Sequence, residues 1–305
     1  MNVSHQADLH VQRMSILLLK AAWVVAIFRG ALKIVPLVSY GRSGSTVFMK
    51  ALKALGCMVH NGPPYEDRTC QMAFLSHLAS LGGLNSIVNS NVNIQDVIAK
   101  VPFFNSHLIA SGQQQLTDLF PHFLEYTKQL CMQGESSLAE KFIGIDLLQS
   151  ISGFIPRNQL RPILLLRDPR DVFLSVKQFN HKRGFRTFND TGDDEMLYRI
   201  ICAFSRQLQE VSSQLNSCLV HYEDLVENPS GVILSLCTFL ELELSDSLIN
   251  NTLTAIQPRS VSDKQHMTSG SLSSTVKKWE AQLTPEFSRI FELHHDKLAG
   301  LQRYE

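Results

Sequence analysis

The residues best suited to chemistry in this chain form one short loop, Tyr40–Thr46, with the sequence YGRSGST. The loop combines two glycines and three aliphatic hydroxyls with one fixed positive charge. The apolar run Ile34–Val38 precedes it and suits a buried strand, although Pro36 interrupts it. Apolar residues at helical spacing follow, with a glycine where a left-handed helix cap would fall: Phe48, Leu52, Leu55 and Gly56. The sequence therefore predicts a strand–loop–helix unit with the polar loop at its junction.

A loop of this composition can bind an anion. The first backbone N–H groups of the helix point into the loop, and the helix dipole favours negative charge there. Gly41 and Gly44 let the backbone approach the anion, and Arg42 can donate paired hydrogen bonds to phosphate or sulfate oxygens. An ordinary glycine–serine turn is the alternative. The loop departs from the standard nucleotide triphosphate motif because Ser45 stands where that motif has lysine, which disfavours a kinase or ATPase.

A second candidate segment, Arg161–Phe179, has the sequence RPILLLRDPRDVFLSVKQF. Its apolar run Ile163–Leu166 is typical of a strand buried on both faces of a parallel sheet. Asp168 followed by proline is a helix start. Arg167 marks the carboxyl end of the strand, where open α/β sheets bind ligands, and Ser175 follows eight residues later. A helix-capping Arg–Asp pair without a ligand is the alternative interpretation.

Together the two segments resemble the sulfotransferase family that uses 3′-phosphoadenosine-5′-phosphosulfate (PAPS), in its bacterial and Golgi-type branch. YGRSGST resembles the 5′-phosphosulfate loop of that family, and LLLRDPRDVFLS resembles its 3′-phosphate motif. Residues 219–240, LVHYEDLVENPSGVILSLCTFL, resemble the R-Y-E-D-L…P…FL segment. Residues 266–283, HMTSGSLSSTVKKWEAQL, resemble the closing H-x-T-S…W…L segment. These four collinear matches extend over most of the chain.

The resemblance implies a role for each matching residue. The 5′-phosphosulfate would be held by Arg42 and by backbone N–H groups of the residues that follow it: Ser43, Gly44, Ser45 and Thr46. Arg42 would also stabilise charge on the leaving oxygen, and the 3′-phosphate would be held by Arg167 and Ser175. Lys278 stands before Trp279 where the family has arginine, so it is a candidate nucleotide contact without the fork geometry of arginine. A solvated surface lysine is the alternative for Lys278.

The catalytic base is implied less directly. Many family members place it at the end of the strand between the two nucleotide motifs, which we expect here at Lys141–Ile145. Asp146 follows that stretch, and a partly desolvated carboxylate can take the proton of an acceptor hydroxyl. A loop-capping aspartate is the alternative. His107 is a second candidate base.

The implied reaction is in-line transfer of a sulfuryl group from PAPS to a hydroxyl or, less often, an amine. The scheme requires no metal, and the six cysteines contain no C-x-x-C pair that would indicate one. Carbohydrate, lipid, small alcohol and peptide tyrosine remain open as acceptors. Two alternatives stay open as well: a P-loop-like nucleotide enzyme that transfers phosphate, and a catalytically inactive sulfotransferase-like binding protein.

Composition agrees with one large α/β domain, because 305 residues can bury a sizeable core. The 28 basic and 28 acidic residues cancel, so net charge does not favour nucleic acid as a partner. A local basic cluster does occur at Lys177–Arg186. It could face an acidic acceptor or the nucleotide, or it could be a solvated loop.

The chain divides into an N-terminal extension, residues 1–30, and a single domain, residues 31–305, in which residues 61–140 are expected to cover the acceptor. The apolar stretch Ser15–Phe28 contains Lys20 and is shorter than the roughly twenty residues that a membrane span needs. We therefore expect a packed helix there, with a membrane-associated or Golgi-type anchor as the alternative. Scattered cysteines fit a cytoplasmic, reducing location.

The remaining elements predict a three-layer α/β/α sandwich with a mainly parallel central sheet, like the P-loop-containing nucleotide hydrolases. A long amphipathic helix is expected over Gly192–Leu215, with its core stripe at Met196, Ile200, Phe204, Leu208, Val211 and Leu215. A further strand is expected at Leu219–Tyr222. Asn228-Pro229 and Thr284-Pro285 each predict the start of a helix.

Overall fold

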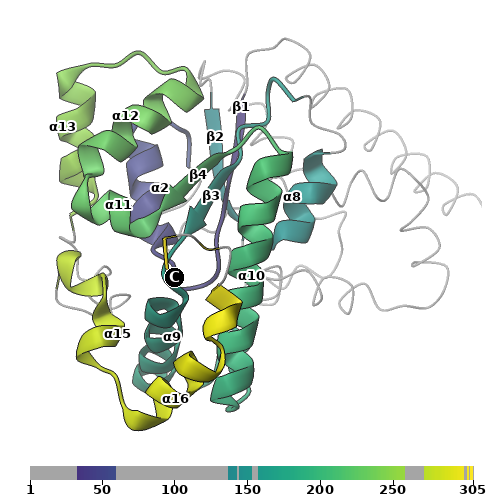
Figure 1. Ribbon diagram of the computed structural model, residues 1–305. Coiled ribbons are helices and arrows are strands. Elements are labelled where there is room, and N and C mark those ends of the chain that lie inside the picture. The colour runs from purple at the N-terminus through teal and green to yellow at the C-terminus, as the bar shows by residue number, and fades with distance from the viewer. Residues whose placement is uncertain are drawn as a thin grey trace, which may run out of the picture.

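The computed structural model describes residues 33–59, 137–142, 144–152, 157–257, 271–298, 301 and 303–304. Within these ranges, a four-stranded sheet in the order β2-β1-β3-β4 forms the centre of the fold (Figure 1). All neighbouring strands are parallel. The strands are β1 (Lys33–Val38), β2 (Ser137–Phe142), β3 (Ile163–Leu166) and β4 (Cys218–His221). The parallel α/β sheet expected from the sequence is thus confirmed.

Helices connect the strands and continue beyond the sheet. In chain order they are α2 (Ser45–Ala54), α8 (Ile145–Ser152), α9 (Pro169–Arg183), α10 (Asp194–Gln214), α11 (Tyr222–Glu227), α12 (Pro229–Leu240), α13 (Asp246–Ala255), α15 (Lys278–Ala281) and α16 (Pro285–Leu293). Short 3-10 helices, η1 (Ser273–Thr275) and η2 (His295–Leu298), occur near the end of the chain.

The sheet is buried on both faces because its strands alternate their side chains between two apolar clusters. In β1, Val35 and Leu37 pack with α2, α12 and α13, whereas Ile34 and Val38 pack with α8 and α10. Figure 1 shows the sheet between these two helical layers. This alternation makes the fold the predicted three-layer sandwich.

A third apolar cluster lies beyond the carboxyl ends of the strands and fixes the direction of α9. The Phe173 ring of α9 meets the Tyr198 ring of α10 edge to face, with centroids 5.9 Å apart. It meets the Phe291 ring of α16 in the same way at 5.8 Å. Because α9 is packed against both helices, its first turn is fixed next to the carboxyl end of β3 (Figure 1).

Local helix signals are confirmed. The Asp168 side chain accepts a hydrogen bond from the Arg170 N–H and caps α9, and Pro169 is the first residue of that helix. Asn228 caps α12, and Thr284 caps α16, each with proline next. Gly56 follows α2 with a left-handed φ of 87°.

The strand expected at Lys141–Ile145 is wrong. β2 ends at Phe142, and α8 begins at Ile145, so Asp146 belongs to a helix. The reason is pairing, because Ser137–Phe142 aligns residue by residue with the whole of β1. The last strand is also displaced, since β4 ends at His221 and Tyr222 opens α11.

The core stripe expected on the long helix is wrong at its start. Met196 is 46% exposed, and the first turns of the helix bury Leu197 and Ile201 instead, whereas Leu208 and Val211 of the expected stripe are buried as predicted. The helix carries apolar residues at two adjacent angular positions, and burial selects the one that begins at Leu197 because it faces the third cluster.

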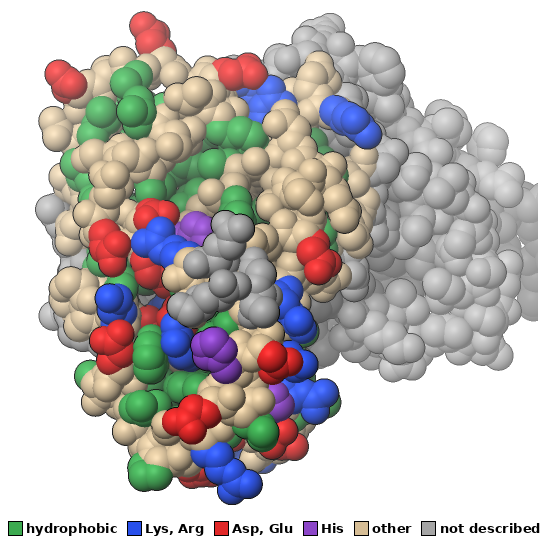
Figure 2. Space-filling model, viewed as in Figure 1, with side chains coloured by type: hydrophobic (Ala, Val, Ile, Leu, Met, Phe, Trp, Pro, Cys, Tyr) green, Lys and Arg blue, Asp and Glu red, His purple; other side chains and the backbone are tan. Residues whose placement is uncertain are grey.

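Several expectations fall outside the described residues: the extension 1–30 with its apolar stretch, His107, and nearly all of residues 61–140. Among the helices that the structure does describe, none has both the length and the apolar character to cross a membrane. On the face drawn in Figure 2, basic and acidic side chains of described residues are interspersed. Positive charge on that face therefore forms no broad single-sign surface.

Candidate functional site

The loop after β1 turns sharply into α2. Arg42 and Gly44 both adopt left-handed conformations, with φ of 72° and 91°. α2 begins at Ser45, and no side chain caps its N-terminus. Its first turn contains no acidic residue. The N–H groups at this helix start therefore remain suited to an anion, as the sequence predicted.

Both loop glycines are required by neighbouring rings. A Cβ added at Gly41 would lie 2.1 Å from the Phe188 ring, and one at Gly44 would lie 2.2 Å from the Tyr222 ring. Tyr222 is buried, and its hydroxyl lies 3.0 Å from the hydroxyl oxygen of Thr275. Packing against these rings was not foreseen from the sequence, which explained the glycines by the approach of an anion alone.

This packing gives a stability prediction. Gly44→Ala is expected to lower the free energy of unfolding by roughly 2–4 kcal/mol, because a left-handed alanine costs about 1–2 kcal/mol and its methyl group must also displace Tyr222. Urea unfolding measures this. The matched control is Gly56→Ala, which has a φ of 87° but no atom within 4 Å of the added methyl group. Equal losses in the two variants would show that the ring contact contributes nothing.

Arg167 lies at the end of β3 and joins two distant segments. One terminal nitrogen donates to the Arg42 carbonyl at 2.9 Å, and the other donates to the Thr275 carbonyl at 2.5 Å. The guanidinium also lies over the Tyr222 ring, 4.8 Å from its centroid. Arg167 is only 5% exposed, and its Nε has no hydrogen-bond partner among the described residues. A buried guanidinium N–H without an acceptor indicates a place for a ligand oxygen.

Arg42 and Ser175 are brought together, although the resemblance assigns them to different phosphates. The Arg42 Nε donates to the Ser175 hydroxyl oxygen at 3.4 Å, and Ser175 is buried. The Arg42 guanidinium lies 4.4 Å from the centroid of the Phe179 ring. Burial, followed by the charges of Arg167 and Arg183, lowers the pKa of Arg42 to about 10. Arg42 therefore stays charged at neutral pH within a field of like charges.

Lys278 is not the solvated surface lysine that was the alternative. It is 6% exposed, and its Nζ donates to the Gln178 side-chain oxygen. Burial, together with the charges of Arg167 and Arg42, lowers its pKa to about 8. Three cations from separate segments thus converge at the carboxyl edge of the sheet.

The pKa of Lys278 predicts a pH dependence. Below about pH 8 the amine is charged and attracts an anion, and above it the charge is lost. Affinity for adenosine 3′,5′-bisphosphate is expected to fall about five- to tenfold between pH 7 and 9.5, the value of one charge-assisted contact. Calorimetry over this range measures it. Lys278→Arg, which stays charged, should show a flat profile, and an equal slope in both proteins would exclude Lys278 as the titrating group.

Asp171 holds Lys278 in place and was not recognised in the sequence. Its Oδ1 accepts from the Trp279 backbone N–H at 2.9 Å, directly after Lys278 in the chain. Burial raises the pKa of Asp171 to about 6, although Arg167 opposes this shift. Asp171 lies three residues after the helix-capping Asp168. This position does not predict its contact with Trp279, because Trp279 is distant in the sequence.

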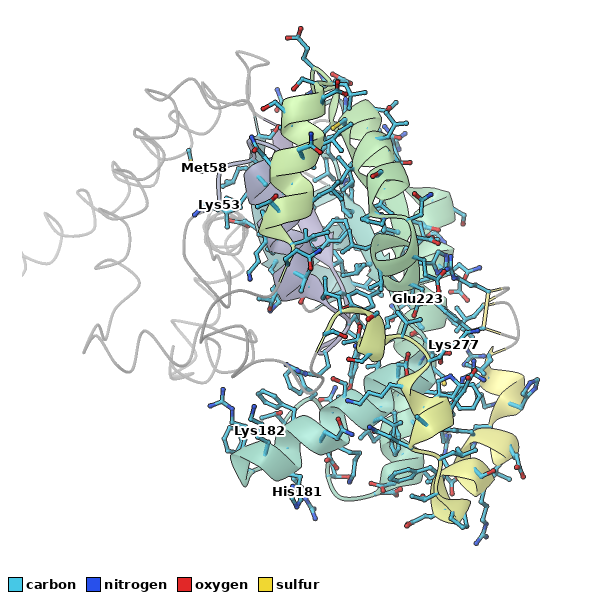
Figure 3. All side chains as sticks on the ribbon, turned by 90° about the vertical axis from the view of Figure 1, so that its left-hand side faces the viewer. Lys53, Met58, His181, Lys182, Glu223 and Lys277 are labelled. Atoms are coloured by element: carbon cyan, nitrogen blue, oxygen red, sulfur yellow. The ribbon has the colours of Figure 1, made fainter. Side chains whose placement is uncertain are left out.

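The side chains of the basic cluster Lys177–Arg186 make different contacts in the structure. Lys177 forms ion pairs with Asp194 at 2.6 Å and Asp190 at 3.6 Å. His181 and Lys182 project from the far end of α9, away from Glu223 and Lys277 (Figure 3). Arg183 lies over the Phe179 ring at 5.3 Å. The charge of Arg183 contributes to the lowered pKa of Arg42.

Neither candidate base has a side chain among the described residues. Asp146 is the second residue of α8, on the opposite helical layer from α2, and its side chain lies outside the described residues. His107 lies outside them as well. Among the described residues, no cluster of three or more His, Cys, Asp or Glu could hold a metal ion.

Comparison with known proteins adds a family and a fold. The family model for the sulfotransferase domain matches residues 35–302. No curated protein matches the chain. The sulfotransferase domain from the curacin biosynthetic pathway is 18% identical, with 86% of this chain and 97% of that chain covered and a TM-score of 0.52. This likeness supports the α/β fold.

Two other solved structures are similar at lower scores. Retinol dehydratase, in complex with androsterone and the inactive cofactor PAP, is 15% identical over 90% of this chain and 83% of that chain, with a TM-score of 0.47. A mouse sulfotransferase complexed with PAP is 12% identical over 87% of this chain and 84% of that chain, with a TM-score of 0.48.

Proposed function

Because the chain belongs to the sulfotransferase domain family, which matches residues 35–302, we propose that its sulfuryl donor is PAPS and its acceptor a hydroxyl or, less often, an amine. Sulfuryl transfer follows from the family. The donor and the acceptor type are the proposal.

The convergence of Arg42, Arg167 and Lys278 is the observation that carries the proposal. These side chains come from the loop after β1, the end of β3 and the start of α15. Arg167 lowers the pKa of both Arg42 and Lys278. Three cations held this close repel one another, so a multiply charged anion among them would be stabilised by all three. A nucleotide with phosphate groups at both ends of its ribose supplies such charge.

The residues present fit this donor. The unpartnered Nε of Arg167 and the helix start at Ser45 provide donors for anionic oxygens. Ser175 of α9 supplies a buried hydroxyl that contacts Arg42. We assign Arg42 and the N–H groups of residues 43–46 to the 5′-phosphosulfate, and Arg167, Ser175 and Lys278 to the 3′-phosphate.

The chain contributes chiefly electrostatics and positioning. When bound, PAPS would supply the sulfuryl group, and its 5′-phosphate would be the leaving group. Arg42 is held by its contacts with Ser175 and Phe179, so its charge is already oriented where negative charge grows on the leaving oxygen. Burial of Arg42 and Lys278 strengthens their electrostatic effect by excluding water. Asp146 and His107 remain the proposed bases for the acceptor proton.

Further parts of the proposal rest on the sequence. We assign residues 31–305 to one domain, with 61–140 covering the acceptor. A reducing, cytoplasmic location is supported by two buried cysteines that form no disulfide within the described part of the chain, Cys202 and Cys237.

The experiment is an acceptor screen with sulfur-labelled PAPS. The panel contains a carbohydrate, a lipid alcohol, a small alcohol, an amine and a tyrosyl peptide. Transfer of label to one class, with stoichiometric release of the bisphosphate, would support the proposal. Tight donor binding without transfer to any class would favour the inactive binding protein. Phosphate transfer from ATP under the same conditions would favour the nucleotide enzyme.

A further inference from the structure

A buried tyrosine lies next to the loop that carries Arg167. Tyr304 is 4% exposed, and its hydroxyl donates to the Glu223 Oε2 at 2.8 Å. The His221 Nδ1 lies 2.9 Å from the same hydroxyl oxygen. Because the phenol has one hydrogen and Glu223 receives it, His221 is the donor in the second hydrogen bond. Tyr304 lies beyond residues 35–302, so this arrangement is not part of the family match.

The hydrogen-bond chain continues from Glu223 to the donor site. Its Oε1 accepts from the Asp168 backbone N–H at 2.9 Å. That N–H shares a rigid peptide plane with the Arg167 carbonyl. Fixing the plane fixes the backbone angle after the Arg167 Cα, and with it the direction in which the Arg167 side chain leaves the chain. Tyr304 therefore reaches Arg167 through one carboxylate and one peptide plane.

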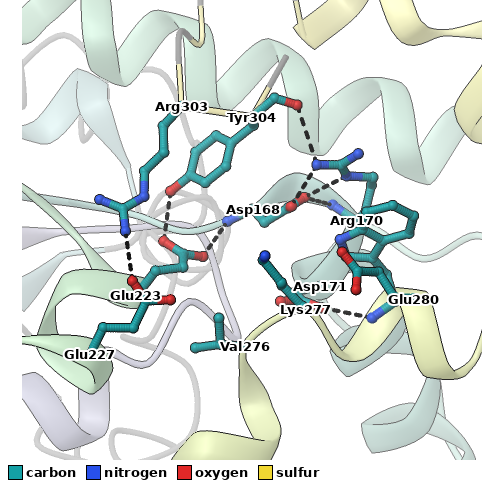
Figure 4. A pocket seen from close by; sticks show the side chains of 11 residues that line it. Asp168, Arg170, Asp171, Glu223, Glu227, Val276, Lys277, Glu280, Arg303 and Tyr304 are labelled. Carbon is teal, nitrogen blue, oxygen red and sulfur yellow. Dashed lines mark hydrogen bonds and ion pairs between the residues drawn. The ribbon is translucent and has the colours of Figure 1, made fainter.

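The backbone of Tyr304 contacts Arg170, which packs on Trp279, the residue that follows Lys278. Its carbonyl accepts from an Arg170 terminal nitrogen at 3.2 Å. Arg170 forms two hydrogen bonds with the Asp168 carboxylate, at 2.9 and 2.8 Å, and lies over the Trp279 ring at 4.1 Å. Figure 4 shows Tyr304 between Glu223 on one side and Arg170 on the other.

The residue before Tyr304, Arg303, forms ion pairs with α11. Arg303 pairs with Asp224 and, at 3.4 Å, with Glu227 of α11. These pairs are partly exposed and contribute little alone. Arg303 and Glu227, together with Tyr304, line a pocket of about 280 Å³ beside the start of α9. Burial, followed by the charge of Glu223, raises the pKa of Tyr304, so the phenol stays protonated and keeps donating.

We propose that Tyr304 is a positioning residue for the donor site, which orients Arg167 toward the 3′-phosphate through Glu223 and the Asp168 N–H. This inference rests on the proposed PAPS donor. Its consequence is expected to be selective, because the hydrogen-bond chain from Tyr304 ends at the cation assigned to the 3′-phosphate and reaches the 5′ loop only through the Arg167 bond to the Arg42 carbonyl.

The test compares adenosine 3′,5′-bisphosphate with AMP by calorimetry on the full chain. Tyr304→Phe keeps the ring and removes only the hydroxyl. It is expected to weaken bisphosphate binding about tenfold, the value of one hydrogen bond to a charged group, and to leave AMP binding within about twofold. In an Arg167→Ala background the same change should have no further effect, since its route to the phosphate is gone.

Ser205→Ala is the matched control, because it deletes a buried hydroxyl that donates to the Ile201 carbonyl within α10. It should change neither affinity. Thermal melting checks that each variant is folded. If the wild type prefers the bisphosphate and Tyr304→Phe keeps that preference, or loses AMP and bisphosphate affinity equally, the positioning role is overturned. If the wild type itself shows no preference, the proposed donor fails and the inference fails with it.

Discussion

Arg167→Ala is expected to abolish the preference for adenosine 3′,5′-bisphosphate over AMP, with a loss of about 100-fold in bisphosphate affinity. The guanidinium is buried, and its Nε has no partner among the described residues. Removal therefore deletes a charge-assisted contact of about 1.5–3 kcal/mol to the 3′-phosphate. The ratio of the two dissociation constants, from calorimetry, measures the effect.

Arg167 also holds the carbonyls of Arg42 and Thr275, so a general collapse of the site must be distinguished. Arg167→Lys is the control, because it keeps the charge but cannot reproduce the two-pronged contact. We expect it to recover only part of the selectivity. An unchanged ratio in Arg167→Ala would remove the 3′-phosphate assignment.

The second large effect is expected at Arg42. Arg42→Met keeps an unbranched side chain and removes the charge, and it is expected to lower kcat about 10²–10³-fold with a smaller change in KM for the donor. The reason is that charge on the leaving oxygen develops during the reaction, so its stabilisation appears mainly in kcat. Transfer of labelled sulfate under saturating donor measures this.

Arg42→Lys is the matched comparison, because it restores a positive charge on the same left-handed backbone position. It should recover most of the lost rate. A variant that raises KM and leaves kcat unchanged would instead show that Arg42 binds the donor equally in the ground state and the transition state.

The sequence was sufficient for the two segments whose signals are local. The loop after β1 and the β3–α9 junction depend on apolar runs, glycines and an Asp-Pro cap, all within a few residues of one another. The same holds for the caps at Asn228 and Thr284. Such signals act through steric and hydrogen-bond effects that do not depend on distant chain.

What could not be predicted depends on distant contacts. β2 was placed too late because SLAEKF contains two charged residues, and only its full pairing with β1 identifies it as a strand. The inward direction of Lys278 follows from the bond between Asp171 and the Trp279 N–H, which joins residues 108 apart. The contact from Arg167 to Thr275 joins residues at the same separation. No local sequence pattern predicts these long-range contacts.

The most direct test of the central claim is calorimetric binding of adenosine 3′,5′-bisphosphate, AMP and ATP to the wild-type chain. The cation group of Arg42, Arg167 and Lys278 predicts that the bisphosphate binds at least about tenfold more tightly than AMP, because an added phosphate gains charge-assisted contacts. ATP, which lacks a 3′-phosphate, should bind more weakly than the bisphosphate. Equal binding of AMP and bisphosphate, or preferred binding of ATP, would contradict the assignment of PAPS as the donor.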